Sequence, residues 1–179
     1  MIVGIDPGIH GLGVSLYNLD KQFIDATYIV GHTVNVKKQY AQEGGKAIQE
    51  VCFATEKWLA VREAYVSPKV MCLEWPQIYI PRGEHPYQSI GKAAAALWLS
   101  AVVGALCSHW AGRIVLVHPH DWKGTLPTET AVKHRVFSRM SEEERKRAAD
   151  CLVAVKGSLQ HNVIDALGIG MHAAGKSLV

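Results

Sequence analysis

The chain has 179 residues, of which 49% are hydrophobic and 20% are charged. This composition is typical of a globular protein and excludes an intrinsically disordered chain. Nineteen basic residues exceed sixteen acidic ones, and the excess lies in residues 113–179, where ten Lys or Arg accompany seven Asp or Glu. A basic excess in one region suits a polyanionic partner, although most such excesses are only solvated faces.

The N-terminal residues lack the basic and apolar regions of a signal peptide. The longest apolar stretch, residues 93–107, is shorter than the roughly 20 residues that span a bilayer. The cysteines are far apart in apolar contexts, which predicts buried thiols in a reducing compartment and argues against a zinc site; they are Cys52, Cys72, Cys107 and Cys151. We therefore expect a soluble, cytoplasmic protein. No repeats or linkers interrupt the sequence, so residues 1–179 are expected to form a single domain.

The first residues predict a strand, 2–5, that ends in the carboxylate of Asp6. Pro7 and Gly8 predict a tight turn, after which strands at about 11–18 and 23–30 complete an antiparallel meander. The first strand is apolar enough to be buried on both faces. A buried carboxylate must be paired, hydrogen-bonded or bound to a metal.

Helices and strands then alternate. The apolar spacing predicts an amphipathic helix over about 36–65, which Gly44-Gly45 could break, and a strand over 69–74 that ends in Glu74 and runs parallel to the first. A loop follows at 79–86. Further elements are a small-residue helix over 89–110, a strand over 114–117, a helix over 129–140 capped by Thr128, a helix opened by the capping box Ser141 to Glu144, and a last helix from Asn162 through 174. This order predicts an α/β protein with the ribonuclease-H-like fold, in which helices flank a mixed five-stranded sheet.

Three acids occupy positions that this fold brings to one edge of the sheet: Asp6 and Glu74 end strands, and Asp165 lies in the first turn of the last helix. Converging carboxylates repel one another, and hard oxygen ligands favour Mg²⁺ or Mn²⁺. Two such ions can activate water for phosphodiester hydrolysis. Each acid taken alone has another interpretation. Asp6 could be a turn residue, Glu74 could pair with Arg82 or Lys92, and Asp165 could form a capping box with Asn162.

The sequence resembles the RuvC-type Holliday-junction resolvases, including the small kind found in phages. The resemblance rests on Gly4-Ile5-Asp6-Pro7-Gly8 with Gly11 and Gly13, on Cys72-Leu73-Glu74, on residues 90–96, on residues 117–124 and on residues 165–170. It implies a homodimeric endonuclease that nicks two strands of a four-way DNA junction, in a bacterial cell or a phage-infected host.

The resemblance also implies roles for individual residues. Asp6, Glu74 and Asp165 match three metal ligands, and the fourth position, usually Asp or His, is Asn162 here, with His161 one residue earlier. We favour His161 beside the metal and Asn162 as a helix cap. Lys123 follows the fifth strand, where a family lysine lies near the scissile phosphate.

Candidate DNA contacts fall in two groups. The cations Arg82, Lys92, Lys133, Arg135 and Arg139 could follow DNA backbones. An aromatic residue after Glu74 packs into the junction centre in the family. Tyr79 is the better candidate for this stacking, because Trp75 is more easily explained as a core residue. The alanine-rich stripe of helix 89–110 favours a dimer contact.

Three other functions stay open. A ribonuclease H or a broader flap or branched-DNA nuclease would have the same fold, and a non-catalytic junction-binding module would not need its acids. An actin-like phosphotransferase domain also begins with Gly-x-Asp-x-Gly, but it needs a second related subdomain for which 179 residues leave no room.

Overall fold

Runs of apolar residues form five strands that join in one mixed sheet. The computed structural model describes residues 1–8, 10–31, 40–62, 69–76, 86–126 and 128–176. The strands are β1 (Ile2–Gly8), β2 (Gly11–Tyr17), β3 (Phe23–Val30), β4 (Val70–Glu74) and β5 (Arg113–Val117), in the order β3-β2-β1-β4-β5. Strands β1, β2 and β3 are antiparallel neighbours, whereas β4 is parallel to both β1 and β5. The predicted mixed five-stranded sheet is confirmed.

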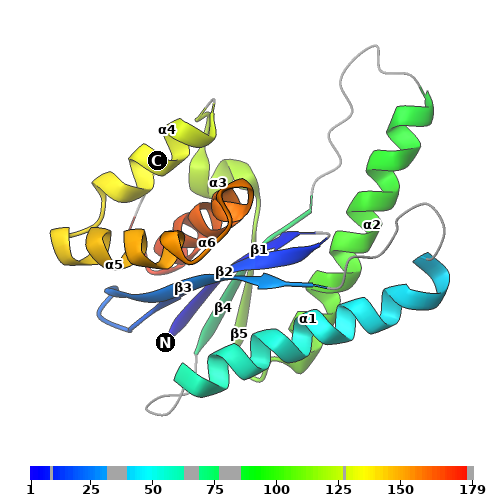
Figure 1. Ribbon diagram of the computed structural model, residues 1–179, viewed down its shortest axis with the longest axis horizontal. Helices are drawn as coiled ribbons and strands as arrows, with labels where there is room; N and C mark the ends of the chain where they lie inside the picture. Colours follow the sequence, from blue (N-terminus) through cyan, green and yellow to red (C-terminus); the bar gives the residue numbers. More distant parts are fainter. Residues whose placement is uncertain (9, 32–39, 63–68, 77–85, 127, 177–179) are drawn as a thin grey trace.

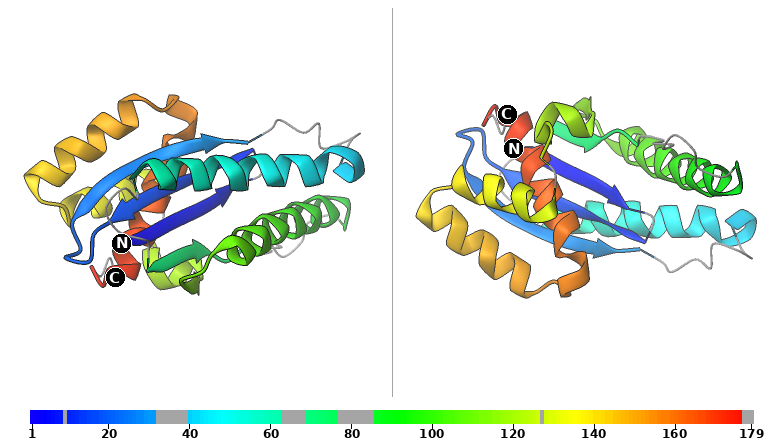
Figure 2. Two further views of the ribbon diagram at one scale, coloured as in Figure 1. Left: turned by 90° about the horizontal axis from the view of Figure 1, so that it is seen from below. Right: turned by 90° about the horizontal axis from the view of Figure 1, so that it is seen from above.

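Helices cover both faces of this sheet (Figure 1). The long helices α1 (Tyr40–Arg62) and α2 (Pro86–His109) lie on one face and run alongside each other (Figure 2). The short helix α3 (Pro119–Lys123) and the helices α4 (Glu129–Ser138), α5 (Glu142–Val153) and α6 (Gln160–Ala173) lie on the other face. Side chains alternate along each strand, so Val3 and Ile5 pack beneath α1 and α2 while Ile2 packs with α6. None of the described helices is long and apolar enough to cross a membrane.

Helix α6 crosses the sheet in close contact with it. A Cβ atom on Gly4 of β1 would lie 2.4 Å from the backbone nitrogen of Gly170, and one on Gly170 would lie 2.5 Å from the Tyr17 ring. The Ser15 hydroxyl donates to the Ala166 carbonyl at 2.6 Å, and the Tyr17 hydroxyl donates to the Leu167 carbonyl at 3.0 Å. Two glycines and two hydroxyl groups therefore fix the position of α6 over β1 and β2.

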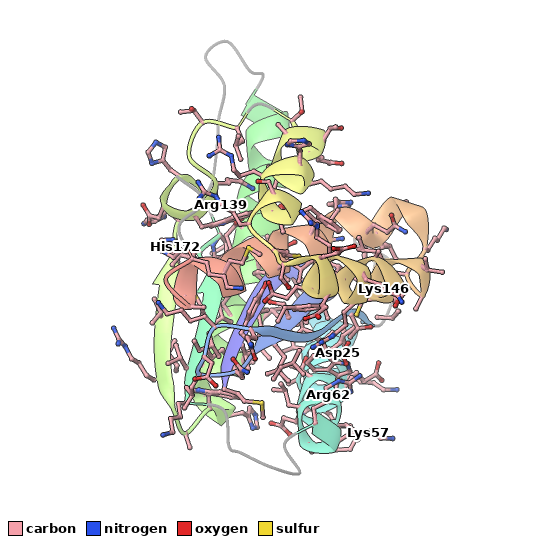
Figure 3. The ribbon with its side chains drawn as sticks, turned by 90° about the vertical axis from the view of Figure 1, so that its left-hand side faces the viewer. Asp25, Lys57, Arg62, Arg139, Lys146 and His172 are labelled. Carbon is pink, nitrogen blue, oxygen red and sulfur yellow. The ribbon has the colours of Figure 1, made fainter. Side chains whose placement is uncertain are left out.

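The edge strand β3 is attached to α1 by an ion pair. The guanidinium of Arg62, which stacks over the Trp58 ring with its carbon 4.1 Å from the ring centroid, donates to the Asp25 carboxylate. Figure 3 shows the side chains of Arg62 in α1 and Asp25 in β3 near each other. A charged, paired side chain on an edge strand disfavours the addition of a foreign strand.

The structure differs from the prediction at the end of β1 and within α1. Pro7 and Gly8 are not turn residues, because β1 continues to Gly8, which pairs with Gly11. Pro7 is tolerated there since β4 pairs with β1 only up to Ile5, and so needs no amide hydrogen from residue 7. The Gly44-Gly45 pair does not break α1, and Gly44 instead lies against Trp98 of α2, whose ring would be 2.6 Å from an added Cβ.

Two helix starts also differ from expectation. The sequence predicts no helix between β5 and residue 129, but Pro119 begins α3, and the amide of His118 donates to the Asp121 carboxylate at 3.0 Å. The last helix begins at Gln160, after a 3₁₀ turn at Gly157–Leu159. The predicted caps of α4 and α5 are confirmed: Thr128 accepts from Ala131, and Ser141 and Glu144 form a capping box.

Candidate active site

Asp6 and Glu74 project from the same face of adjacent strands. Ile5 pairs with Leu73 in the parallel β1–β4 ladder, so the residues that follow them, Asp6 and Glu74, share the face covered by α6. Across the antiparallel ladders Asp6 pairs with Gly13, and Gly13 pairs with Tyr28. One lateral row of the sheet therefore carries two carboxylates, a glycine and a phenol.

Two further side chains reach this row from helices. Asp165 comes from the second turn of α6, and Lys123 from the last residue of α3. The Lys123 ammonium nitrogen lies 3.5 Å from Oδ2 of Asp165 and 3.9 Å from Oε2 of Glu74. The structure thus brings together four predicted site residues that lie up to 159 positions apart in the chain.

The three carboxyl groups are electrostatically strained. Burial raises the pKa of Asp6 well above its ordinary value, and the charges of Asp165 and Glu74 raise it further. Burial also raises the pKa of Glu74 and Asp165, although the nearby Lys123 ammonium opposes both shifts. The side chains of Glu74 and Asp165 are only 18% and 21% exposed. One ammonium group therefore does not compensate three partly buried carboxylates, and the cluster favours additional positive charge.

The sequence alone did not single out Trp122 and Tyr28. Trp122 is fully buried, and its indole Nε1 donates to Oε2 of Glu74 at 2.7 Å. Tyr28 lies close enough to Asp6 for that charge, after burial, to raise the pKa of its phenol. In the sequence, Trp122 could have been found only from its position beside Lys123. Tyr28 could have been found only from the strand register that a tight β1–β2 hairpin imposes.

Asn162 occupies a different position from that predicted, whereas His161 lies near Asp165. Asn162 is not the helix cap, because α6 begins two residues earlier; its backbone carbonyl instead covers Gly13, where an added Cβ would be 2.0 Å away. His161 is partly buried, and its interaction with Asp165 lowers the pKa of that carboxyl. His161 also lines a pocket of about 410 Å³ with Lys133 of α4.

The predicted DNA contacts are only partly brought to the site. Lys133 lies beside it, whereas Arg139 lies beyond the other end of α4, and Arg135 is half-buried between them. Trp75 follows β4 directly and is 39% exposed, so its interpretation as a core residue is wrong. Tyr79 and Arg82 lie outside the described residues, as does the side chain of Lys92.

The donor chemistry of this cluster fits a divalent cation. Asp6, Glu74 and Asp165 offer hard oxygen atoms, and their raised pKa values reflect negative charge that a cation would stabilise. Within the described part of the chain, no three Asp, Glu, His or Cys side chains already form a metal-binding group. The carboxylates are arranged instead around the Lys123 ammonium.

Comparison with solved structures identifies the architecture. A structure of T. thermophilus RuvC in complex with a Holliday junction substrate superposes with a TM-score of 0.57 and 19% identity, over 97% of this chain and 92% of that one. The chain has the fold of the RuvC-type resolvases. The resolvase fold also matches the yeast mitochondrial Holliday junction resolvase Ydc2, with a TM-score of 0.55 and 14% identity over 98% of this chain and 80% of that one.

A third match is the Fowlpox virus resolvase in complex with Holliday junction DNA, with a TM-score of 0.53 and 13% identity over 98% of this chain and 99% of that one. No protein-family model and no curated protein matches the sequence. The comparisons establish the resolvase fold.

Proposed function

We propose that this protein is a metal-dependent DNA endonuclease that resolves four-way junctions by paired nicks. The observation that carries the proposal is the meeting of Asp6, Glu74 and Asp165 around Lys123, at the edge where β1 and β4 end. Acidic side chains from two strands and the last helix form a site suited to phosphodiester hydrolysis, on a fold shared with proteins solved on junction DNA.

Asp6, Glu74 and Asp165 would hold two Mg²⁺ or Mn²⁺ ions, with His161 beside them. Burial, and then the charges of Asp165 and Glu74, raise the pKa of Asp6 well above its ordinary value, so Asp6 is the acid that a bound cation would stabilise most. Bound ions supply activation of water and stabilisation of the leaving oxygen. Asn162, which could offer its side-chain carbonyl oxygen, is the alternative to His161.

Lys123 and Lys133 would contact the backbone of the cut strand. Lys123 holds a positive charge within 4 Å of two carboxylates, where it can interact with a phosphate that reaches them. Lys133 is exposed on the α4 side of the cleft beside His161. We assign Arg135 and Arg139, with Arg82 and Lys92, to more distant phosphates, and Trp75 or Tyr79 to the opened centre of the junction.

Symmetric nicking requires two active sites, and α2 offers a surface for a second copy. Four exposed residues recur on a single face of this helix and are mostly small: Leu97, Ala101, Gly104 and Ser108. An added Cβ on Gly104 would meet nothing within 4 Å, so the backbone there is open to close approach. Leu97 itself is 71% exposed. We infer that this face forms the homodimer contact.

The test is a panel of labelled substrates: a four-way junction, a fork, a flap, an RNA–DNA hybrid and linear duplex. Mg²⁺-dependent cutting of the junction, with symmetric nicks that disappear in chelator and in Asp6→Asn, is the expected result. Junction binding by Asp6→Asn should persist. Preferential cutting of the hybrid would instead favour a ribonuclease H, and cutting of flaps or forks a broader branch nuclease. Normal junction cutting by Asp6→Asn would refute the assignment of the site.

A further inference from the structure

Tyr28 is a polar side chain of the carboxylate row that the proposed mechanism does not use. It lies on β3, two strands away from Asp6, and only Gly13 separates the two residues in the register. All three positions project to the face that α6 covers. Gly13 has no side chain, and the backbone carbonyl of Asn162 in α6 fills the space over it, between the carboxylate and the phenol.

The glycines of the β1–β2 hairpin hold the phenol in place. Gly11 has φ of +149°, a conformation that side chains rarely adopt, and an added Cβ there would be 2.7 Å from the Tyr28 hydroxyl. The ring therefore lies over Gly11, at the end of the hairpin beyond Asp6. Residue 11 thus has to be glycine both for its backbone and for the room that Tyr28 occupies.

The hydroxyl has no hydrogen-bond partner among the described residues. The hydroxyl of Tyr17, on the same face of the sheet, by contrast donates to the Leu167 carbonyl. A tyrosine hydroxyl is a hydrogen-bond donor at neutral pH. A half-buried hydroxyl favours a hydrogen-bond acceptor, which a bound ligand can supply.

We propose that the Tyr28 hydroxyl donates a hydrogen bond to a backbone phosphate of the cut DNA strand, next to the scissile one. This inference rests on the proposed nuclease function. Lys123 lies on the β4 side of Asp6, and Tyr28 lies on the opposite, β3 side. A strand placed with its scissile phosphate at Asp6 would pass the end of the β1–β2 hairpin, beyond the Asn162 carbonyl, to reach the Tyr28 hydroxyl at Gly11, and tyrosine hydroxyls are regular donors to phosphate oxygens.

The decisive variant is Tyr28→Phe, which removes only the hydroxyl, with Tyr17→Phe as its matched control. Junction affinity is measured by fluorescence anisotropy in chelator, and cutting by single-turnover kinetics in Mg²⁺. Tyr28→Phe should weaken binding about ten- to a hundredfold, the value of a hydrogen bond to a charged acceptor. Tyr17→Phe should lower thermal stability and leave junction affinity unchanged. Equal affinity of wild type and Tyr28→Phe would overturn the proposal.

A second arm identifies the acceptor. Single phosphates on either side of the cut are replaced by neutral methylphosphonates. At one phosphate, the methylphosphonate should weaken junction binding by wild type by the same factor as the mutation Tyr28→Phe does. The same methylphosphonate should not weaken junction binding by Tyr28→Phe any further. If the loss of affinity from the mutation and the loss from the methylphosphonate add at every phosphate, Tyr28 does not contact a phosphate. If wild type binds the junction but never cuts it, the nuclease proposal fails while the binding data still decide the role of Tyr28. If wild type does not bind the junction, both proposals fail.

Discussion

The indole nitrogen of Trp122 lies 2.7 Å from Oε2 of Glu74, and it donates a hydrogen bond to that carboxylate from a fully buried position. This contact lowers the pKa of Glu74 against the effect of burial. It also fixes one carboxylate oxygen, since the Trp122 ring is packed in the core and cannot rotate freely. We infer that Trp122 positions Glu74 for its role in the site.

Replacing Trp122 with Phe should slow junction cutting about ten- to a hundredfold, the usual effect of losing a group that orients a metal ligand. Because the lost hydrogen bond favours the ionised carboxylate, the pKa of Glu74 should rise further. The acid limb of the pH–rate profile should therefore move to higher pH. Single-turnover cutting measured across the pH range checks both effects.

The chain offers a matched control for this change. The indole nitrogen of Trp110 is also buried but has no hydrogen-bond partner among the described residues. Trp110→Phe should therefore be neutral or slightly stabilising, with an unaltered pH–rate profile. A profile for Trp122→Phe that matches that of Trp110→Phe would show that the contact with Glu74 does not matter for activity.

Replacing Lys123 with Met should have opposite effects on metal affinity and on the rate of DNA cutting. The Lys123 ammonium stands 3.5 Å from Asp165 and competes with any cation that these carboxylates bind. Its removal should tighten Mn²⁺ binding, by about tenfold on the electrostatic scale of such contacts, while the cutting rate falls. Calorimetric titration of the free protein measures the first effect. Weaker Mn²⁺ binding would argue that Lys123 supports the metal site rather than competing with it.

The contribution of Asp6 to the stability of the metal-free protein should decrease as pH rises. Folding raises the pKa of Asp6 above its ordinary value of 3.8, so the folded state binds this proton more tightly than the unfolded state does. Above pH 3.8, ionisation therefore costs free energy of folding. Asp6→Asn should be the more stable protein at neutral pH, and the difference should shrink toward acid pH. Urea unfolding at several pH values tests this, and parallel curves for the two proteins would contradict it.

One methyl group added where α6 crosses closely over β1 should destabilise the protein. Gly4→Ala would place a Cβ 2.6 Å from the Ala166 carbonyl, so α6 has to move. Overpacking of this kind costs about 1–3 kcal/mol. Asp165 is adjacent to Ala166, so cutting should fall as well. As a control, Gly45→Ala in α1 meets nothing within 4 Å and should stabilise the protein by about 0.5–1 kcal/mol.

The proposed dimer contact on α2 can be tested by placing a charged side chain on that face. Leu97→Arg should yield a monomer in sedimentation, because a cation facing its own copy is repelled. The monomer should still nick but lose the coupling of the two nicks. Phe53 of α1 is as exposed as Leu97, at 68% against 71%, so Phe53→Arg is a control of equal chemistry that should leave the dimer intact. A dimer that survives Leu97→Arg would place the contact elsewhere.

The sequence allowed the fold to be predicted because local patterns agreed with it. Apolar runs that end in Asp6 and Glu74 indicated parallel strands with their acids at one edge, and the ladder has that register. Contacts between distant residues could not be read in this way. Nothing near Trp122 indicates that its indole faces a carboxylate 48 positions earlier. Likewise, Asn162 has the chemistry of a cap, but the preceding 3₁₀ turn shifts the helix start to Gln160.

The position of α6 has a consequence for the order in which the protein is made. The site joins Asp6 to Asp165, which follows it 159 positions later in the chain. The helix that carries Asp165 also supplies much of one core, through Val163, Leu167, Ile169 and Met171. A nascent chain therefore contains Asp6, Glu74 and Lys123 before α6 has been synthesised. We expect the proposed nuclease activity to begin only after the ribosome has released α6.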